Sequence, residues 1–256
     1  MRYFLEIAYN GKNYFGWQRQ PNEISVQQVL EECLTTFLRQ HISIVGAGRT
    51  DTGVHAKQMF AHFDCDVIED LDNFRYRMNS FLPYDIVINE VMAVAASAHA
   101  RFDAKERTYQ YVIVTKKDPF KDKLAYQLFH KPDVVKMNQA AKLLLGRQDF
   151  KCFSKSKTDV KTYYCDIKSA LWVEEGSKIV FTITADRFLR NMVRAIVGTL
   201  LDIGFGKKSV ADLEAILNSG NRSMAGASAP AEGLYLVEVA YPSAIFGERK
   251  AQRERL

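Results

Sequence analysis

The sequence predicts an α+β fold made of two similar split-βαβ (ferredoxin-like) halves, expected at residues 1–104 and 105–256. Three observations support this prediction. The first half shows the pattern order β-α-β-β-α-β, and the second half repeats that order with one extra helix before its last strand. The 256 residues, of which 47% are hydrophobic, suffice for one large core or two smaller ones. If the two sheets join edge to edge, one mostly antiparallel sheet carries the helices on one face and leaves an open cleft on the other.

The first half opens with a strand pattern that ends at the turn pair Asn10-Gly11. Ser25, with Gln28 three residues later, predicts the start of a helix through a capping box. A second helix stops before Pro83, because a proline disfavours helical geometry in the residue that precedes it. The predicted elements are a strand at 2–9, a helix at 26–38, strands at 42–45 and 59–65, a helix at 71–82 and a strand at 86–94.

In the second half, Glu174-Glu175-Gly176-Ser177 separates two strand patterns and predicts a hairpin. Gly146 is expected to close the helix that precedes this hairpin, since glycine commonly terminates helices. Ser209, followed by Asp212 three residues later, starts the inserted helix. The predicted elements are a strand at 109–114, a helix at 134–145, strands at 163–173 and 178–185, helices at 188–203 and from 209, and a strand at 234–240.

Composition argues against several classes of protein. No apolar run approaches the length of a membrane span, and the N-terminus lacks a signal-peptide pattern. The four cysteines, at positions 33, 65, 152 and 165, show no close pairing, which predicts a reduced cytoplasmic protein without a zinc site. The net charge of +5 and the pI near 8.9 suit a polyanionic partner without requiring one.

The most informative segment is the glycine-rich loop from Gly46 to Ala56, which places Asp51 between two predicted strands. Its glycines permit backbone conformations that other residues avoid, and they allow a ligand to approach closely. Arg49, two residues before Asp51, favours the ionised carboxylate. These features fit a nucleophile. They also fit a turn in which Asp51 only caps backbone amides.

The predicted helix from Phe188 carries a basic face beside its apolar face. Arg187, Arg190 and Arg194 follow helical spacing, and no acidic residue among them offsets their mutual repulsion. An anion such as a phosphate group opposite the three arginines would offset it. A solvated helix face is the alternative interpretation.

Aromatic residues lie among basic ones in three further segments. Tyr109, on a predicted strand, is either a packing residue or a stacking surface for a nucleobase. The segment from Tyr14 to Gln20 either packs as a loop plug or meets RNA. Another loop offers four lysines to phosphates, at Lys151, Lys155, Lys157 and Lys161.

At these residues the sequence resembles the TruA family of tRNA pseudouridine synthases. The similarity runs nearly end to end and rests on six motifs in the order and spacing of the family. They are Tyr14-Phe15-Gly16-Trp17-Gln18-Arg19-Gln20, Gly48-Arg49-Thr50-Asp51-Thr52-Gly53-Val54-His55-Ala56, His99-Ala100-Arg101-Phe102, Arg107-Thr108-Tyr109-Gln110-Tyr111, Phe188-Leu189-Arg190-Asn191-Met192-Val193-Arg194 and Ala229-Pro230-Ala231-Glu232-Gly233-Leu234-Tyr235-Leu236. Thr52 departs from the family, in which many members have alanine.

The resemblance implies isomerisation of uridine to pseudouridine at positions 38, 39 and 40 of the tRNA anticodon stem-loop. It implies a homodimer in which the tRNA site spans both subunits, and neither a cofactor nor a metal. By matching position it makes Asp51 the nucleophile, Arg194 its basic partner and Tyr109 the tyrosine that stacks on the target base. It also implicates Arg49 in holding the target nucleotide out of the stack. The charge pattern adds Arg187 and Arg190 as substrate-binding residues.

Two other functions compete with this one. The protein could be an RNA-binding or RNA-folding module in which catalysis is dispensable. It could also be a metal-dependent hydrolase that uses Asp51 and His55, although the spacing of its histidines and carboxylates matches no usual ligand set. The sequence leaves open which tRNAs are used and whether Asp51 attacks the ribose or the uracil ring.

Overall fold

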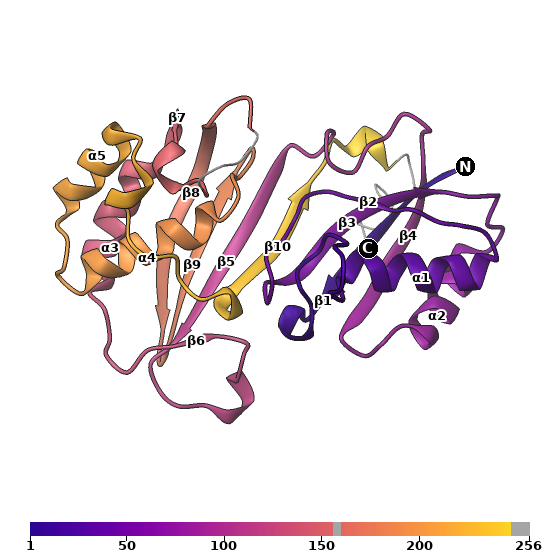
Figure 1. Ribbon diagram of the computed structural model, residues 1–256, viewed down its shortest axis with the longest axis horizontal. Coiled ribbons are helices and arrows are strands. Elements are labelled where there is room, and N and C mark those ends of the chain that lie inside the picture. The colour runs from indigo at the N-terminus through magenta and orange to yellow at the C-terminus, as the bar shows by residue number, and fades with distance from the viewer. Residues whose placement is uncertain (156–159, 247–256) are drawn as a thin grey trace. The chain divides into compact units, whose positions relative to one another are not determined.

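The computed structural model describes residues 1–155 and 160–246. Within that part of the chain it is a mixed α+β structure with five α-helices and mostly antiparallel strands (Figure 1). The chain divides into two compact units, and the first unit comprises Met1–Lys105 together with the segment that begins at Leu236. The second unit is Glu106–Tyr235. The halves expected at 1–104 and 105–256 differ from this division in the C-terminal segment, which groups with the first unit.

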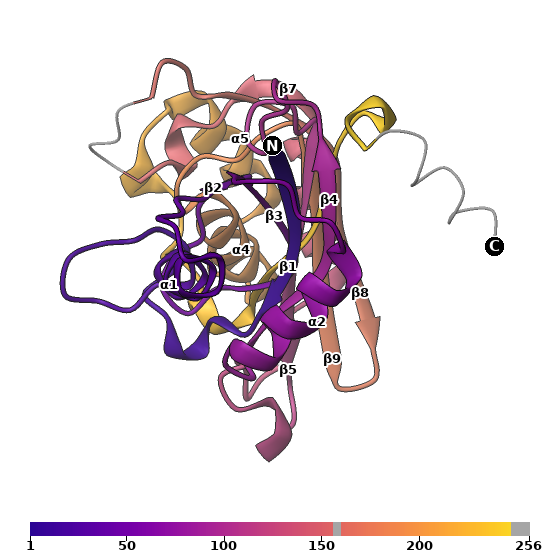
Figure 2. The same ribbon diagram turned by 90° about the vertical axis from the view of Figure 1, so that its right-hand side faces the viewer.

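The first unit follows the predicted order β-α-β-β-α-β and adds most of the last strand among the described residues. Its elements are β1 (Arg2–Tyr9), α1 (Val26–Leu38), β2 (Val45–Gly46), β3 (His55–Asp64), α2 (Leu71–Phe81), β4 (Ile86–Val94) and β10 (Leu234–Ala240). In the sheet, β1 lies antiparallel between β4 and β3, and both β2 and β10 lie beside β3. The helix α2 packs on β4 and against α1 (Figure 2).

The strand predicted at 42–45 is wrong in extent, because only Val45 and Gly46 pair with β3. The preceding residues are bound by side chains of α1 instead. The amide of Ile44 donates to Glu31 Oε1 at 3.0 Å, and its carbonyl accepts from Gln27 Nε2 at 3.1 Å. Hydrogen bonds from side chains therefore satisfy the backbone groups of Ile44, which the apolar pattern assigned to pairing between strands.

Both faces of β1 are covered in the first unit. Tyr3, Phe4 and Leu5 are consecutive and fully buried, and successive strand side chains point to opposite faces. On the Phe4 face, the rings of Tyr241 and Phe246 lie 5.6 and 6.2 Å from Phe4. The C-terminal segment therefore completes the core of the unit that the N-terminal strand begins.

His62 on β3 is buried on the same face as Phe4, and its Nδ1 accepts a hydrogen bond from the amide of Ala100 at 3.1 Å. Burial, with smaller effects of Arg2 and His99, lowers the pKa of His62 to about 4 from its ordinary value of 6.5. The unfolded chain therefore binds the proton first as pH falls. Stability from neutral His62 is complete above about pH 6.5 and is lost as pH falls toward about 4.

We expect His62→Asn to flatten the dependence of stability on pH in this range. Asparagine keeps an acceptor near the position of Nδ1 but does not titrate. Urea unfolding at neutral and acidic pH should show a loss for the wild type that exceeds the loss for the variant by up to ~3 kcal/mol. Equal losses in the two proteins would assign the acid sensitivity to other groups.

The second unit contains the predicted hairpin and the inserted helix. Its elements are β5 (Glu106–Val114), β6 (Tyr126–Gln127), α3 (Val134–Ala141), β7 (Gly146–Asp149), β8 (Tyr164–Glu175), β9 (Lys178–Ala185), α4 (Met192–Gly204) and α5 (Val210–Ser219). The sheet order is β5-β9-β8-β7, and these neighbours are antiparallel. Glu175 pairs with Lys178 across a two-residue turn, and Ser209 with Asp212 forms the predicted capping box of α5.

The helix predicted at 188–203 is wrong at its start, because α4 begins only at Met192. Asn191 has a φ of +66°, in the left-handed region that interrupts a right-handed helix. The residues from Phe188 to Asn191 therefore precede the helix, with Arg190 and Asn191 in a turn. Arg187 and Arg190 do not lie on one helical face with Arg194, so that part of the spacing argument is corrected.

Within the described residues, no helix combines the length and the hydropathy that a bilayer crossing requires. The edge-to-edge joining of two sheets over an open cleft concerns both units at once and stays a prediction.

Candidate functional site

Asp51 lies in the loop between β2 and β3 of the first unit, where it is half-buried and Arg49 is exposed. The backbone on both sides of Asp51 is held by contacts distant in sequence. Thr50 accepts from the amide of Trp17 at 3.2 Å through its carbonyl, and its Oγ1 lies 2.9 Å from the hydroxyl of Tyr9. The amide of Gly53 donates to the carbonyl of Tyr14 at 3.2 Å. The loop is therefore preorganised around its carboxylate.

An aromatic segment lies against this loop. Tyr14 and Trp17 are buried, and the Tyr14 hydroxyl donates to the carboxylate of Asp85. Burial, followed by that hydrogen bond, raises the pKa of Tyr14 far above its ordinary value, so the phenol keeps its proton. Gly46 lies directly against the indole of Trp17, where a Cβ would come within 2.5 Å of Nε1. Tyr14 and Trp17 thus pack as the loop plug that was one of the two interpretations.

His55, at the start of β3, is buried in the same region. Its Nδ1 accepts a hydrogen bond from the amide of Gly11 at 3.0 Å. That nitrogen serves the fold by joining the loop after Asp51 to the turn after β1. Among residues 1–155 and 160–246, no group of three or more histidine, cysteine, aspartate or glutamate side chains is arranged to hold a metal ion.

Tyr109 lies on β5 in the second unit, and Phe188 packs edge-on against its ring with centroids 5.1 Å apart. Tyr109 is half-exposed, whereas Tyr111, two residues along the strand, is fully buried. The hydroxyl of Tyr111 donates to the carbonyl of Pro230 at 2.8 Å. The two tyrosines thus differ in role: Tyr111 anchors a loop, and Tyr109 presents a ring that Phe188 orients.

Arg194 lies in the first turn of α4 and makes two hydrogen bonds with Ala229. Its Nε donates to the carbonyl of Ala229 at 2.7 Å, and the amide of Ala229 donates to the carbonyl of Arg194 at 2.9 Å. Arg187 is half-buried in the segment after β9, and Arg190 is exposed in the turn before the helix. Only Arg194 of the three is fixed by a contact of this kind in the described structure.

The predicted site residues divide between the two units. Asp51 and Arg49 share a loop of the first unit, and the second unit holds the other four, Tyr109, Arg187, Arg190 and Arg194. The pairing of Asp51 with Arg194 stays a prediction. The sequence did not single out Phe188 or Ala229 as contacts of the site. Both stand in the quoted motifs, which is the only signal that pointed to them.

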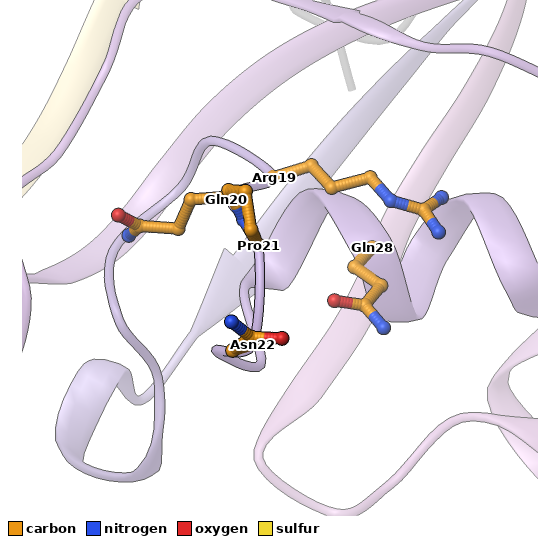
Figure 3. Close-up of a pocket in the computed structure, with 5 residues that line it drawn as sticks. All are labelled: Arg19, Gln20, Pro21, Asn22 and Gln28. Atoms are coloured by element: carbon orange, nitrogen blue, oxygen red, sulfur yellow. The ribbon is translucent and has the colours of Figure 1, made fainter.

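Two other features bear less on the chemistry. An open pocket of about 380 Å³ lies between the segment after β1 and α1, lined by Arg19, Gln20, Pro21, Asn22 and Gln28 (Figure 3). It contains none of the predicted site residues. In the lysine-containing loop, Lys151 lies over the ring of Tyr163 at 5.8 Å, and Lys157 falls outside the described residues.

The chain is similar to one described protein family and to known proteins from several bacteria. A family model described as tRNA pseudouridine synthase matches residues 7–103 and 140–242. Proteins called tRNA pseudouridine synthase A are similar over nearly the whole chain. The one from Porphyromonas gingivalis is 52% identical and covers 96% of this chain and 99% of its own, and the one from Bacteroides fragilis is 52% identical over 96% and 98%. That of Francisella tularensis subsp. holarctica (strain LVS) is 39% identical over 95% of each chain.

Among solved structures, a chain from a crystal structure of a Cbf5-Nop10-Gar1 complex is 11% identical, with a TM-score of 0.34. The alignment covers 91% of this chain and 57% of that one. A similarity of this size supports no conclusion about the fold.

Proposed function

Because the chain belongs to the tRNA pseudouridine synthase family, we propose that it isomerises uridine to pseudouridine at positions 38, 39 and 40 of the tRNA anticodon stem-loop. Asp51 is the nucleophile of this proposal. The observation that carries it is the support of the Asp51 loop. Trp17 and Tyr14 bind its backbone on either side of half-buried Asp51, and the Tyr9 hydroxyl meets the side-chain hydroxyl of Thr50. Preorganisation of this kind is what a reacting group requires.

The reaction breaks the bond from uracil N1 to the ribose C1′ and forms a bond from C1′ to uracil C5, which then loses its proton. N1 gains a proton, so atoms and charge balance within one nucleotide. Nothing is oxidised and no water is consumed, so the reaction requires no redox cofactor and no activated water. An ionised carboxylate can attack C1′ of the ribose or the uracil ring, and both routes use Asp51 as the nucleophile.

The remaining residues have roles that follow from their chemistry. Arg194, as the basic partner of Asp51, favours the ionised form of the carboxylate. The target base must leave its stack, which costs a few kcal/mol, and a stacking contact with Tyr109 offsets part of that cost. The edge-on contact of Phe188 supports this role because it orients the Tyr109 ring. Arg49, exposed beside Asp51, is proposed to hold the nucleotide in its flipped position.

The proposed partner is the anticodon arm of tRNA, and the proposed assembly is a homodimer whose tRNA site spans both subunits. The proposed location is the cytoplasm. The net charge of +5 supports a polyanionic partner. These assignments rest on the family.

The experiment that tests the function is a map of pseudouridine in tRNA. Unmodified tRNA transcripts are incubated with the purified protein, and tRNA from a deletion strain is compared with tRNA from its parent. Pseudouridine should form at positions 38, 39 and 40 with the protein and be missing there in the deletion strain. Modification confined to other positions would overturn the proposed site while leaving the reaction in place.

Arg190→Ala is expected to weaken tRNA binding and to reduce the slope of log affinity against log salt by about 1. The reason is that Arg190 is exposed in the turn before α4 and is proposed to meet a backbone phosphate. Binding is measured by filter retention over a series of salt concentrations. Arg75→Ala is the control, because Arg75 lies on α2 and pairs with Asp72 at 3.2 Å. A slope equal to that of the wild type would favour a solvated role for Arg190.

A further inference from the structure

The loop from Arg222 to Pro230, here called the 222–230 loop, follows α5, leads toward β10 and lies along α4 (Figure 1). Two glycines permit this close packing. A Cβ on Gly198 would lie 1.7 Å from the carbonyl oxygen of Ala227, and one on Gly226 would lie 2.9 Å from the backbone of Thr199. The amide of Gly226 donates to the buried Oγ1 of Thr199 at 2.8 Å. The loop thus lies backbone to backbone on the helix that carries Arg194.

The same loop determines how Arg194 is held. The Ala229 residue both donates to the Arg194 carbonyl and accepts from Arg194 Nε, as described above. A guanidinium group is planar, so a bond at Nε restricts the direction of its other donors. The orientation of the Arg194 head group therefore depends on the position of the 222–230 loop at Ala229.

Ser228, the neighbour of Ala229, is held by two side chains. Its Oγ accepts from Asn191 Nδ2 at 2.6 Å and from Arg222 Nη2 at 3.0 Å. Arg222 also donates from Nη1 to the carbonyl of Gly226 at 3.0 Å. One arginine thus bridges two points of the loop that lie two residues apart, and its rigid fork sets their separation.

Asn191 supports the same arrangement from the other side. It occupies the N-cap position of α4 in the left-handed region, and its side chain makes no capping bond with the helix. The side-chain amide of Asn191 instead donates a hydrogen bond to Ser228. A residue suited to cap a helix here joins the first turn of α4 to the loop that holds Arg194.

We infer that Arg222 is a positioning residue for Arg194. It bridges Gly226 and Ser228, this bridge fixes the position of the neighbouring Ala229, and the Ala229 carbonyl orients the guanidinium of Arg194. The inference rests on the proposed function, in which Arg194 is the basic partner of the nucleophile. Arg222 acts through the loop and is not itself assigned a contact with the substrate.

Arg222→Ala is expected to lower kcat on the order of 10- to 100-fold, as a small misplacement of a catalytic group does, and to leave KM for tRNA within about 3-fold. Arg222→Lys keeps the charge but offers a point donor in place of a fork, so an intermediate kcat is expected. Asn138→Ala is the control for lost hydrogen bonds. Asn138 is half-buried in the same unit and also makes two bonds, to the backbone of Trp172 at 2.8 and 2.9 Å. This control should lose stability and retain kcat.

A double-mutant cycle links the effect to Arg194. If Arg222 acts through Arg194, Arg222→Ala should add little to the loss in kcat caused by Arg194→Lys. Ser228→Ala, which removes the shared acceptor, provides the same cycle should Arg222→Ala fail to fold. Full activity of Arg222→Lys and Ser228→Ala, or losses that multiply with that of Arg194→Lys, would overturn the inference.

Hydrogen exchange separates this inference from the proposed function. The amide of Ala229, which donates to the carbonyl of Arg194, should exchange at least about 10-fold faster in Arg222→Lys than in the wild type. Asn138→Ala is the control for a loss of global stability and should not show this local increase. Unchanged exchange would overturn the inference whatever the activity. Failure of the proposed function would appear differently, as a wild-type protein that forms no pseudouridine in tRNA.

Discussion

Asp51→Asn abolishes pseudouridine formation, with an expected loss in rate on the order of 10⁴-fold or more, as for removal of a nucleophile in other enzymes. Asparagine has almost the volume of aspartate and accepts hydrogen bonds, but it is neutral and a poor nucleophile. The loop around it is held by backbone and hydroxyl contacts of Thr50 and Gly53, which the change leaves in place. Stability and tRNA affinity should therefore stay close to those of the wild type. Single-turnover assays on a tRNA transcript measure the rate.

This variant also separates the enzyme from an RNA-binding module with dispensable catalysis. A deletion strain is supplied with the wild-type protein or with Asp51→Asn, and growth and tRNA pseudouridine are compared. An enzyme requires the carboxylate for both readouts. Rescue of growth by the variant without pseudouridine would favour the binding module. Retained isomerisation would remove Asp51 from the proposed mechanism.

Gly16→Ala is expected to destabilise the first unit and to slow the reaction together. Gly16 has a φ of +83°, and a Cβ there would lie 2.4 Å from the carbonyl oxygen of Thr50. The left-handed conformation costs alanine roughly 1 kcal/mol and the backbone clash roughly 1–3 kcal/mol more. Since Thr50 precedes Asp51, relief of the clash displaces the nucleophile, and a loss in kcat on the order of 100-fold follows. Urea unfolding and single-turnover kinetics measure the two effects.

Gly48→Ala is the matched control in the same loop. A Cβ on Gly48 meets no atom within 4 Å, and Gly48 has no left-handed φ. Because alanine restricts the unfolded chain more than glycine does, the variant should gain about 0.5 kcal/mol of stability. Equal stability of the two variants would show that the contact between Gly16 and Thr50 does not hold the loop.

Local sequence predicts the loop that holds Asp51 but not the position of Arg190. The loop of Asp51 lies between two strands as predicted, although β2 is shorter and β3 begins earlier than the apolar runs indicate. Arg190 does not lie on the predicted helix face, because Asn191 adopts a left-handed conformation. The spacing of apolar residues carries no information about this conformation. Asparagine is compatible both with a helix interior and with this turn, so the pattern alone favours the longer helix.

The sequence by itself determined the order of the elements in the first unit, the capping box of α5, the hairpin of β8 and β9, and the family to which the chain belongs. These depend on contacts between near neighbours or on motifs written along the chain. The sequence predicted neither β6 nor β7 of the second unit. Only the tertiary structure decided what holds the functional groups. Tyr9 meets Thr50 across 41 residues and Arg194 meets Ala229 across 35. The first bond joins two side-chain hydroxyls and the second joins a side chain to a backbone carbonyl. Such groups are common and carry no local pattern, so the tertiary fold selects their partners.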